Sequence, residues 1–187
     1  MKRFLPFLTL FFLLGLIGFS TYKLNKKQSN NDGQDQKSSQ ESNIHFEQTK
    51  IFLPEFSFPD LFDESGEFSK KDLMGKFSIV NFFASWCTTC RAEHEVLLRL
   101  QQEGIIDIYG VAWRDIDKKT KDYLEDSGNP FKKVAKDSQG LFNKITGIEA
   151  VPETLIIDKS GNVVMRYRGN LQEFSIDEIK NFLEQNK

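Results

Sequence analysis

Cysteine is scarce in this chain, which has only Cys87 and Cys90 among its 187 residues. Small domains that depend on disulfides for stability spread their cysteines along the chain, so that each bond closes a large loop. A bond between these two residues would close almost no loop, and the spacing therefore argues against a disulfide with a purely structural role. Histidine is equally scarce, with only His45 and His94 present. A closed zinc site needs four ligands, so this thin set favours a redox pair over structural zinc.

An excess of charge of either sign is also missing. The 25 Lys and Arg residues nearly balance the 27 Asp and Glu residues, and the formal net charge is -2 at pH 7. A nucleic-acid-binding domain usually carries a strongly basic face, so the sequence gives no indication of such a partner. The length suits one ordinary domain rather than two, and the sequence contains no internal repeat.

Long hydrophobic runs are absent except near the first residue. The apolar segment 4–19 follows Lys2 and Arg3 and precedes a polar tract. The residues after it lack the small-residue pattern at which a signal peptide is cleaved. The run is slightly shorter than the ~20 residues that cross a bilayer, but the residues after it can extend it into the interface. We therefore expect residues 1–23 to form an N-terminal transmembrane or signal anchor.

A polar segment separates this run from the rest of the chain. Its first part is rich in Asn, Gln, Ser, Lys and Asp and has almost no apolar residue. Such a segment cannot bury enough surface to offset its ordering entropy. We expect residues 24–50 to be a flexible polar linker, and residues 51–187 to form the folded domain.

The pattern of apolar residues predicts alternating strands and helices in that domain. A β-rich run, an amphipathic helix that Gly104 ends, and a second β-rich run come first. A Ser-Gly-Asn turn then joins two strands as a hairpin, and the Ser-x-x-Glu sequence at Ser175 predicts the start of a last helix. The expected strands are 56–62 (an edge strand broken by Pro59), 76–83, 105–112, 154–157 and 163–167, and the expected helices are 86–102, 117–126, 139–146 and one from Ser175. This order implies an α/β fold with a mixed sheet covered by helices on both faces.

The cysteine pair falls where a strand is expected to run into a helix. Unsatisfied N–H groups and the helix dipole stabilise negative charge there, so the pKa of Cys87 should be depressed, and Arg91 can add to the positive field. Cys90 lies one helical turn further on and is expected to be more buried. Cys87 is thus the predicted attacking thiol and Cys90 the resolving one. Glu93, another turn along, can act as general base for Cys90, or can be only a solvated helix charge.

The motifs around these residues resemble the thioredoxin superfamily. More narrowly, they are similar to the membrane-tethered thiol:disulfide interchange proteins of cytochrome c maturation, the CcmG/DsbE group. The resemblance extends over about residues 51 to 187, and it is carried by the segment from Asn81 to His94, by Gly110-Val111, by Gly128-Asn129-Pro130 and by Val151-Pro152-Glu153-Thr154. It implies a thioredoxin fold, with a central mixed β-sheet flanked by helices and an N-terminal membrane anchor.

The resemblance also implies roles for single residues. Pro152 matches the cis-proline that faces the disulfide, and Val151 would pair with an extended partner peptide through its backbone. Trp86 and Asp115 are expected to contribute to the same partner-binding surface, Asp115 as a second acid. Glu93 matches the acidic residue of the family's active-site region.

Two further positions bear on the chemistry that the family implies. Asn81 stands where general thioredoxins keep a buried Asp, and its amide cannot act as a base. Thr88 stands where some members of the group have proline, which leaves the reducing strength open.

The combined pattern predicts a reductase with no cofactor beyond the redox-active Cys87–Cys90 disulfide, and no bound metal. Its expected substrate is a disulfide of apocytochrome c or of an accessory thiol protein, and its expected electron donor is a membrane carrier. A tethered reductant would be superfluous in a reducing cytosol, so we expect a single-pass protein of the inner membrane with its catalytic domain on the periplasmic side. Two alternatives remain, a more general periplasmic reductase or oxidant and a Cu(I)-delivery module, since soft thiolates select Cu(I).

Overall fold

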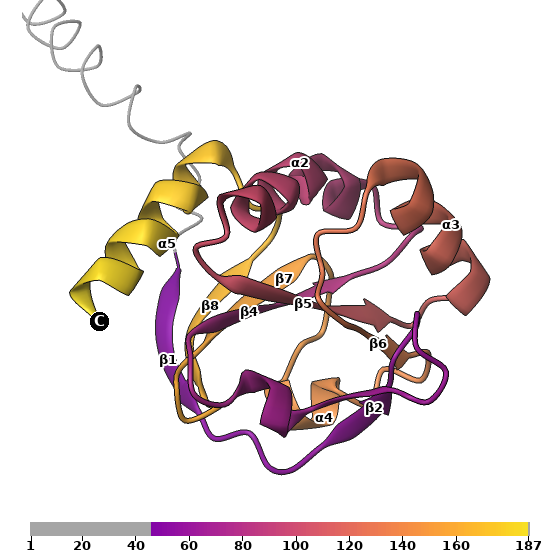
Figure 1. Cartoon of the computed structure of the whole chain (residues 1–187), viewed down its shortest axis with the longest axis horizontal. Helices are drawn as coiled ribbons and strands as arrows, with labels where there is room; N and C mark the ends of the chain where they lie inside the picture. Colours follow the sequence, from indigo (N-terminus) through magenta and orange to yellow (C-terminus); the bar gives the residue numbers. More distant parts are fainter. Residues whose placement is uncertain (1–45, 187) are drawn as a thin grey trace, which may run out of the picture. The chain divides into compact units, whose positions relative to one another are not determined.

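The computed structural model describes residues 46–186 (Figure 1). The predicted anchor, residues 1–23, lies outside the described residues, as do residues 24–45 of the predicted linker. Within the described part, none of the helices has the length and apolar character needed to cross a membrane.

Six strands form one mixed sheet in the order β1-β8-β7-β4-β5-β6. The pairs β4–β5 and β5–β6 are parallel, and the other pairs are antiparallel. The strands are β1 (Glu47–Ile51), β4 (Ser78–Phe83), β5 (Asp107–Trp113), β6 (Val134–Asp137), β7 (Glu153–Ile157) and β8 (Val163–Arg168). A separate antiparallel pair consists of β2 (Ser57–Pro59) and β3 (Glu67–Ser69).

Helices cover both faces of the sheet, as the sequence predicts. Figure 1 shows α2 and α3 over one face, with α4 and β2 on the opposite side. The helices are η1 (Lys70–Leu73, a 3-10 helix), α2 (Thr88–Glu103), α3 (Asp117–Ser127), α4 (Asn143–Thr146) and α5 (Glu173–Gln185).

The central strand β4 explains why the protein has two cores. Successive side chains of a strand point to opposite faces of the sheet. Ile79 and Phe83 accordingly pack in the core that includes residues of α2, α3 and α5, whereas Val80 and Phe82 pack in the core beneath η1 and α4. All six residues of β4 are buried, which accounts for apolar residues on both faces of the strand.

Several elements differ from the sequence prediction. The expected edge strand 56–62 is reduced to β2, which pairs with β3 outside the main sheet, and neither β3 nor η1 was predicted. Helix α4 begins at Asn143 rather than at residue 139. Strand β1 begins at Glu47, so residues 47–50, which we expected in the linker, pair with β8 at the edge of the sheet. Strand β6 was not predicted, because four residues show too little alternation to be recognised. Helix α5 begins at Glu173 rather than after Ser175, and Ser175 Oγ accepts a hydrogen bond from the N–H of Gln172 at 3.1 Å.

The parallel pair β4–β5 determines where the functional site lies. Both strands run in the same direction, and Phe83 is paired with Ala112 near their carboxyl ends. The loop after β4 and the loop after β5 therefore leave the sheet side by side. The first of them contains Cys87, and the second contains Asp115.

Candidate active site

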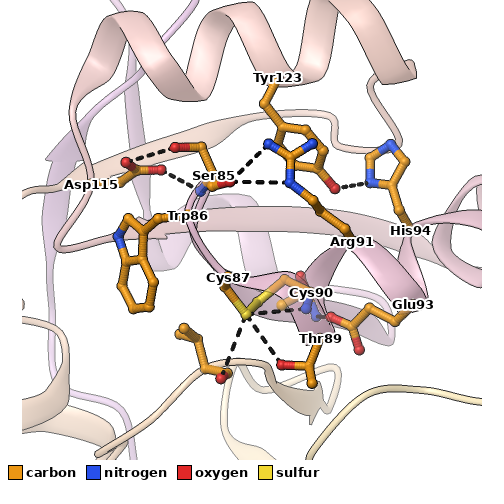
Figure 2. The surroundings of a disulfide bond; sticks show 12 residues. Ser85, Trp86, Cys87, Thr89, Cys90, Arg91, Glu93, His94, Asp115 and Tyr123 are labelled. Carbon is orange, nitrogen blue, oxygen red and sulfur yellow. Dashed lines mark hydrogen bonds between the residues drawn. A yellow bond between two sulfur atoms is a disulfide. The ribbon is translucent and has the colours of Figure 1, made fainter.

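Cys87 and Cys90 form a disulfide at the start of α2 (Figure 2). Their Cα atoms are 5.3 Å apart. Cys87 is the N-cap residue of the helix, and its Sγ accepts a hydrogen bond from the N–H of Cys90 at 3.1 Å. A thiolate on Cys87 would gain from this N–H and from the positive end of the helix dipole. The predicted position of the pair at a strand-to-helix junction is confirmed.

Little of the disulfide reaches solvent. Cys87 is 5% exposed and Cys90 2% exposed, so the difference between the two sulfurs is smaller than the sequence led us to expect. Trp86, directly before Cys87, is 58% exposed. Its Nε1–H donates to the carbonyl of Arg114 at 3.3 Å, and this fixes the indole beside the cysteines.

The loop that contains Val151 and Pro152 faces the disulfide. The peptide bond between these two residues is cis, and the carbonyl oxygen of Val151 lies 3.7 Å from Cys87 Sγ. Among the described residues, neither the N–H nor the carbonyl of Val151 has a backbone hydrogen-bond partner. Both groups therefore remain available to an extended peptide, which is the pairing expected from the sequence.

A cavity of about 540 Å³ extends from this loop. Thr89 forms one wall, and its Oγ1 lies 3.4 Å from Cys87 Sγ. The other walls are formed by residues of the loop before β7 and the end of β8: Gly147, Glu149, Ala150, Val151, Pro152, Glu153, Arg168, Gly169 and Asn170. The cavity therefore adjoins the attacking sulfur and is large enough for one or two side chains of a bound peptide.

Glu93 is fully buried, one helical turn beyond Cys90 (Figure 2). Its Oε1 accepts a hydrogen bond from Asn81 Nδ2 at 2.8 Å, and its Oε2 accepts one from the N–H of Leu171 at 2.8 Å. Burial raises the pKa of Glu93 to about 7, although the two hydrogen bonds act in the opposite direction. Glu93 is therefore not a solvated helix charge. A carboxyl group that titrates near neutral pH can accept the proton of Cys90.

Asn81 occupies the centre of β4 and links Glu93 to the neighbouring strand. Its Nδ2 also donates to Thr154 Oγ1 at 3.0 Å. The side chain is fully buried, and its Oδ1 has no hydrogen-bond partner within the described residues. Asn81 thus holds the acid in place, which is consistent with an amide that cannot itself take the proton.

We expected Asp115 to be an acid of the partner-binding surface, but the structure places it inside the protein. It is 6% exposed, and both carboxylate oxygens accept hydrogen bonds from within the chain. Oδ2 accepts from the N–H of Ser85 at 2.5 Å and from Thr120 Oγ1 at 2.8 Å, and Oδ1 accepts from Ser85 Oγ at 2.9 Å and from the N–H of Ile116 at 2.8 Å. The carboxylate supports the loop before Cys87 instead of pointing at a partner.

Arg91 and His94 are joined through Tyr123 of α3. The guanidinium of Arg91 lies 4.4 Å from the centre of the Tyr123 ring, and the Tyr123 hydroxyl is 2.8 Å from His94 Nδ1. Burial raises the pKa of Tyr123 to about 12, so the phenol keeps its proton. His94 Nε2 faces the carbonyls of Ser127 and Gly128, at 3.2 and 3.0 Å. Both ring nitrogens are therefore occupied, and His94 packs α2 against α3.

Three residues near the cysteines were not singled out from the sequence. Ser85 holds the loop before Cys87, Thr89 lines the cavity, and Thr154 binds Asn81. Hydroxyl side chains of this kind are common in loops and strands, and no spacing distinguishes them.

The described part of the chain has no group of three or more His, Cys, Asp or Glu side chains arranged to bind a metal ion.

The fold and the site together define a thioredoxin-fold protein with a redox-active dithiol. The Redoxin family model matches residues 48–183, and the chain belongs to the Redoxin family. The similarity to thiol:disulfide interchange proteins that we inferred from the motifs is confirmed by the relatives described next.

Two relatives and one solved structure illustrate the match. The thiol:disulfide interchange protein HelX of Rhodobacter capsulatus is 38% identical over 107 residues, which are 57% of this chain and 60% of HelX. The thiol:disulfide interchange protein DsbE of Haemophilus influenzae is 35% identical over 121 residues, or 65% of this chain and 66% of that protein. The matched segment thus spans about three fifths to two thirds of these relatives.

A DsbF homologue from Corynebacterium diphtheriae shows the same fold. Its crystal structure has a TM-score of 0.66 and 19% sequence identity, and the match covers 78% of this chain and 96% of the other.

Proposed function

We propose that this protein is a thiol:disulfide oxidoreductase that reduces protein disulfides through Cys87 and Cys90. The observation that carries the proposal is the disulfide at the start of α2, directly opposite the Val151 carbonyl. The buried Glu93 next to Cys90 supplies the proton acceptor that a resolving thiol needs. The relatives named DsbE and HelX, both thiol:disulfide interchange proteins, support the same activity.

The reaction starts from the dithiol form. The Cys87 thiolate attacks one sulfur of the substrate disulfide, and the other substrate sulfur leaves as a thiolate. Cys90 then gives its proton to Glu93 or water, attacks the Cys87 sulfur of the mixed disulfide and releases the second substrate thiolate. Two electrons pass from the dithiol to the substrate, and the Cys87–Cys90 disulfide forms. A membrane dithiol carrier returns the protein to its reduced state by the reverse exchange.

The substrate that we propose is a disulfide of apocytochrome c, or of an accessory thiol protein that handles it. Support comes from the resemblance of the motifs to the cytochrome c maturation group. The cavity beside Val151 and the free backbone groups of that residue suit an extended peptide that contains the target cysteine.

The location that we propose is the periplasmic side of the inner membrane, with one N-terminal span as anchor. It is supported by the apolar run of residues 4–19 between basic residues and by the need for a dedicated reductant in an oxidising compartment. Disulfides persist there, whereas the cytosol keeps thiols reduced without such help.

The reduction potential of the Cys87–Cys90 pair tests the direction of electron flow. The full chain would be equilibrated in thiol buffers of graded potential and followed by Trp fluorescence, since Trp86 lies beside the disulfide. We expect a value near or below about -200 mV, as in reductants. A value close to that of the strong oxidants, about -120 mV, would mean that the protein donates disulfides and would overturn the proposed direction.

A further inference from the structure

Ser85, two residues before Cys87, has all three of its polar groups bound. Its N–H and its hydroxyl donate to Oδ2 and Oδ1 of Asp115, at 2.5 and 2.9 Å. Its carbonyl oxygen accepts from Nη2 and Nε of Arg91, at 2.8 and 3.2 Å. Figure 2 shows Ser85 between these two side chains, with the carboxylate on one side and the guanidinium on the other. We call Asp115, Ser85 and Arg91 the Ser85 clamp.

Helix α3 supports both charged ends of the clamp. Asp115 Oδ2 accepts from Thr120 Oγ1 at 2.8 Å, and the guanidinium of Arg91 stacks over Tyr123 at 4.4 Å from the ring centre. Thr120 and Tyr123 are three residues apart, so they lie on the same side of α3. The loop before Cys87 is thereby fastened to a helix that contributes no cysteine and no residue of the cavity.

The clamp lies within the turn that carries the attacking sulfur. The N–H of Cys87 donates to the carbonyl of Ala84 at 3.1 Å, so Ser85 is inside that turn. The sulfur of Cys87 in turn accepts the N–H of Cys90 at 3.1 Å. In the disulfide form the S–S bond also holds Cys87 in this place. When the bond opens, the clamp remains and, together with the backbone hydrogen bonds of Cys87, holds the turn at the helix terminus.

We propose that Asp115 and Arg91 are positioning residues that hold the Cys87 sulfur at the N-terminus of α2 once the disulfide has opened. The inference rests on the proposed oxidoreductase function and deepens it. Neither residue contacts the reacting sulfurs; both act through Ser85. Loosening the clamp lets the sulfur drift from the Cys90 N–H, so the thiolate loses stabilisation and attacks more slowly.

If Asp115 and Arg91 acted on Cys87 only through their charges, two conservative substitutions would have effects different from those that the clamp predicts. Asp115→Asn removes a negative charge near Cys87, and a field effect alone would lower the pKa of the Cys87 thiol. Whichever way the new amide turns, its NH₂ group faces the N–H of Ser85 or of Ile116, so one backbone donor loses its acceptor. Arg91→Lys keeps the charge but loses the bidentate contact with the Ser85 carbonyl. A field effect alone would leave the pKa of the Cys87 thiol unchanged.

Other charged groups surround the dithiol and stay the same in both variants. They are Glu93 behind it, and Glu149, Glu153 and Arg168 around the adjoining cavity. A rise in the pKa of Cys87 in either variant can therefore be assigned to the clamp.

The experiment measures the rate of alkylation of Cys87 by iodoacetamide against pH, in the full chain with Cys90→Ser, where Cys87 is the only thiol. We expect the pKa of Cys87 to rise in both Asp115→Asn and Arg91→Lys, and the alkylation rate at pH 7 to fall about tenfold, as for the loss of one charge-assisted hydrogen bond. Matched controls are Asp122→Asn on α3 and Arg99→Lys on α2, whose ion pairs lie on the surface. Neither control should change the profile.

Each outcome decides the proposal. A lowered pKa in Asp115→Asn together with an unchanged one in Arg91→Lys would show a pure field effect and overturn the clamp. If Asp115→Asn fails to fold, as judged by thermal denaturation, Arg91→Lys decides alone, because its surface position spares the core. The assay needs no protein substrate. An oxidising reduction potential would therefore refute the proposed direction of electron transfer without affecting this test.

Discussion

Asn81 Nδ2 donates a hydrogen bond to Oε1 of Glu93 at 2.8 Å, and both side chains are fully buried. A buried carboxyl group favours its protonated form, whereas hydrogen bonds donated to it favour the ionised form. Burial is the larger effect here, and the pKa of Glu93 is raised to about 7. The group can therefore accept or release a proton under neutral conditions, one helical turn from Cys90.

Glu93 should make the protein less stable as pH rises. The unfolded chain releases this proton near pH 4.5 and the folded chain near pH 7. Between these values the folded state binds more protons, so the free energy of unfolding decreases with pH, by about 3 kcal/mol in total. Glu93→Gln should abolish this part of the dependence, which urea titrations between pH 4.5 and 8 would measure. The exposed Glu95→Gln on the same helix is the control and should keep the wild-type slope. Equal slopes in wild type and Glu93→Gln would refute the assignment.

Removal of the Asn81 side chain should raise the pKa of Glu93 above its wild-type value. In Asn81→Ala the carboxylate of Glu93 keeps the Leu171 N–H but loses one donor. The pKa of Glu93 should rise, and the protein should be destabilised by about 1–3 kcal/mol through the lost buried hydrogen bonds. The double variant Asn81→Ala/Glu93→Gln should show no such titration. If the midpoint stays where it is in wild type, Asn81 does not act on Glu93.

The two cysteines should behave differently when each is replaced. Cys90→Ser removes the resolving thiol, so a disulfide-containing peptide should remain attached to Cys87 as a mixed disulfide that mass spectrometry detects. Cys87→Ser should give at least tenfold less adduct, because only Cys87 is the N-cap residue of α2, where the helix terminus stabilises a thiolate. Equal adducts in the two variants would contradict the assignment of Cys87 as the attacking residue.

The ion pair between Arg166 and Glu153 should stabilise the wall of the cavity. Arg166 Nε lies 2.8 Å from Glu153 Oε1, and both side chains are buried. Arg166 also donates to the carbonyl of Thr146. Burial raises the pKa of Glu153 even though Arg166 opposes the shift. Arg166→Met leaves this buried carboxylate with only the exposed Arg168, whose Nε lies 4.0 Å from Glu153 Oε1, and should cost up to about 3 kcal/mol in unfolding experiments.

A second substitution separates the charge from the packing. In Arg166→Met/Glu153→Leu no unpaired buried charge remains, so most of the lost stability should return. A double variant as unstable as the single one would indicate that packing around Arg166, rather than the buried charge, determines the effect.

Much of the fold could be predicted from local pattern. The apolar run of β4, the αL glycine Gly104 that ends α2, and the Asp158–Asn162 turn between β7 and β8 each depend on neighbours in sequence. The missed elements depend on distant ones. Strand β1 is a strand because it pairs with β8, more than a hundred residues away, and its sequence is as polar as the segment before it. Helix α5 is an exception, because its start depends on a local hydrogen bond from the N–H of Gln172 to Ser175 Oγ within the first turn.

The sequence by itself determined the order of the reacting groups. Cys87, Cys90 and Glu93 are spaced by three residues, and helical geometry alone places each one a turn beyond the last. Only the tertiary structure decided what surrounds them. Asp115 supports Ser85 from 30 residues away, and Leu171 binds Glu93 from 78 residues away. These contacts exist because β4 and β5 end at the same edge of the sheet and because α5 packs on α2. Burial, which gives Glu93 its pKa, is likewise a property of the assembled core, and no local spacing of residues encodes it.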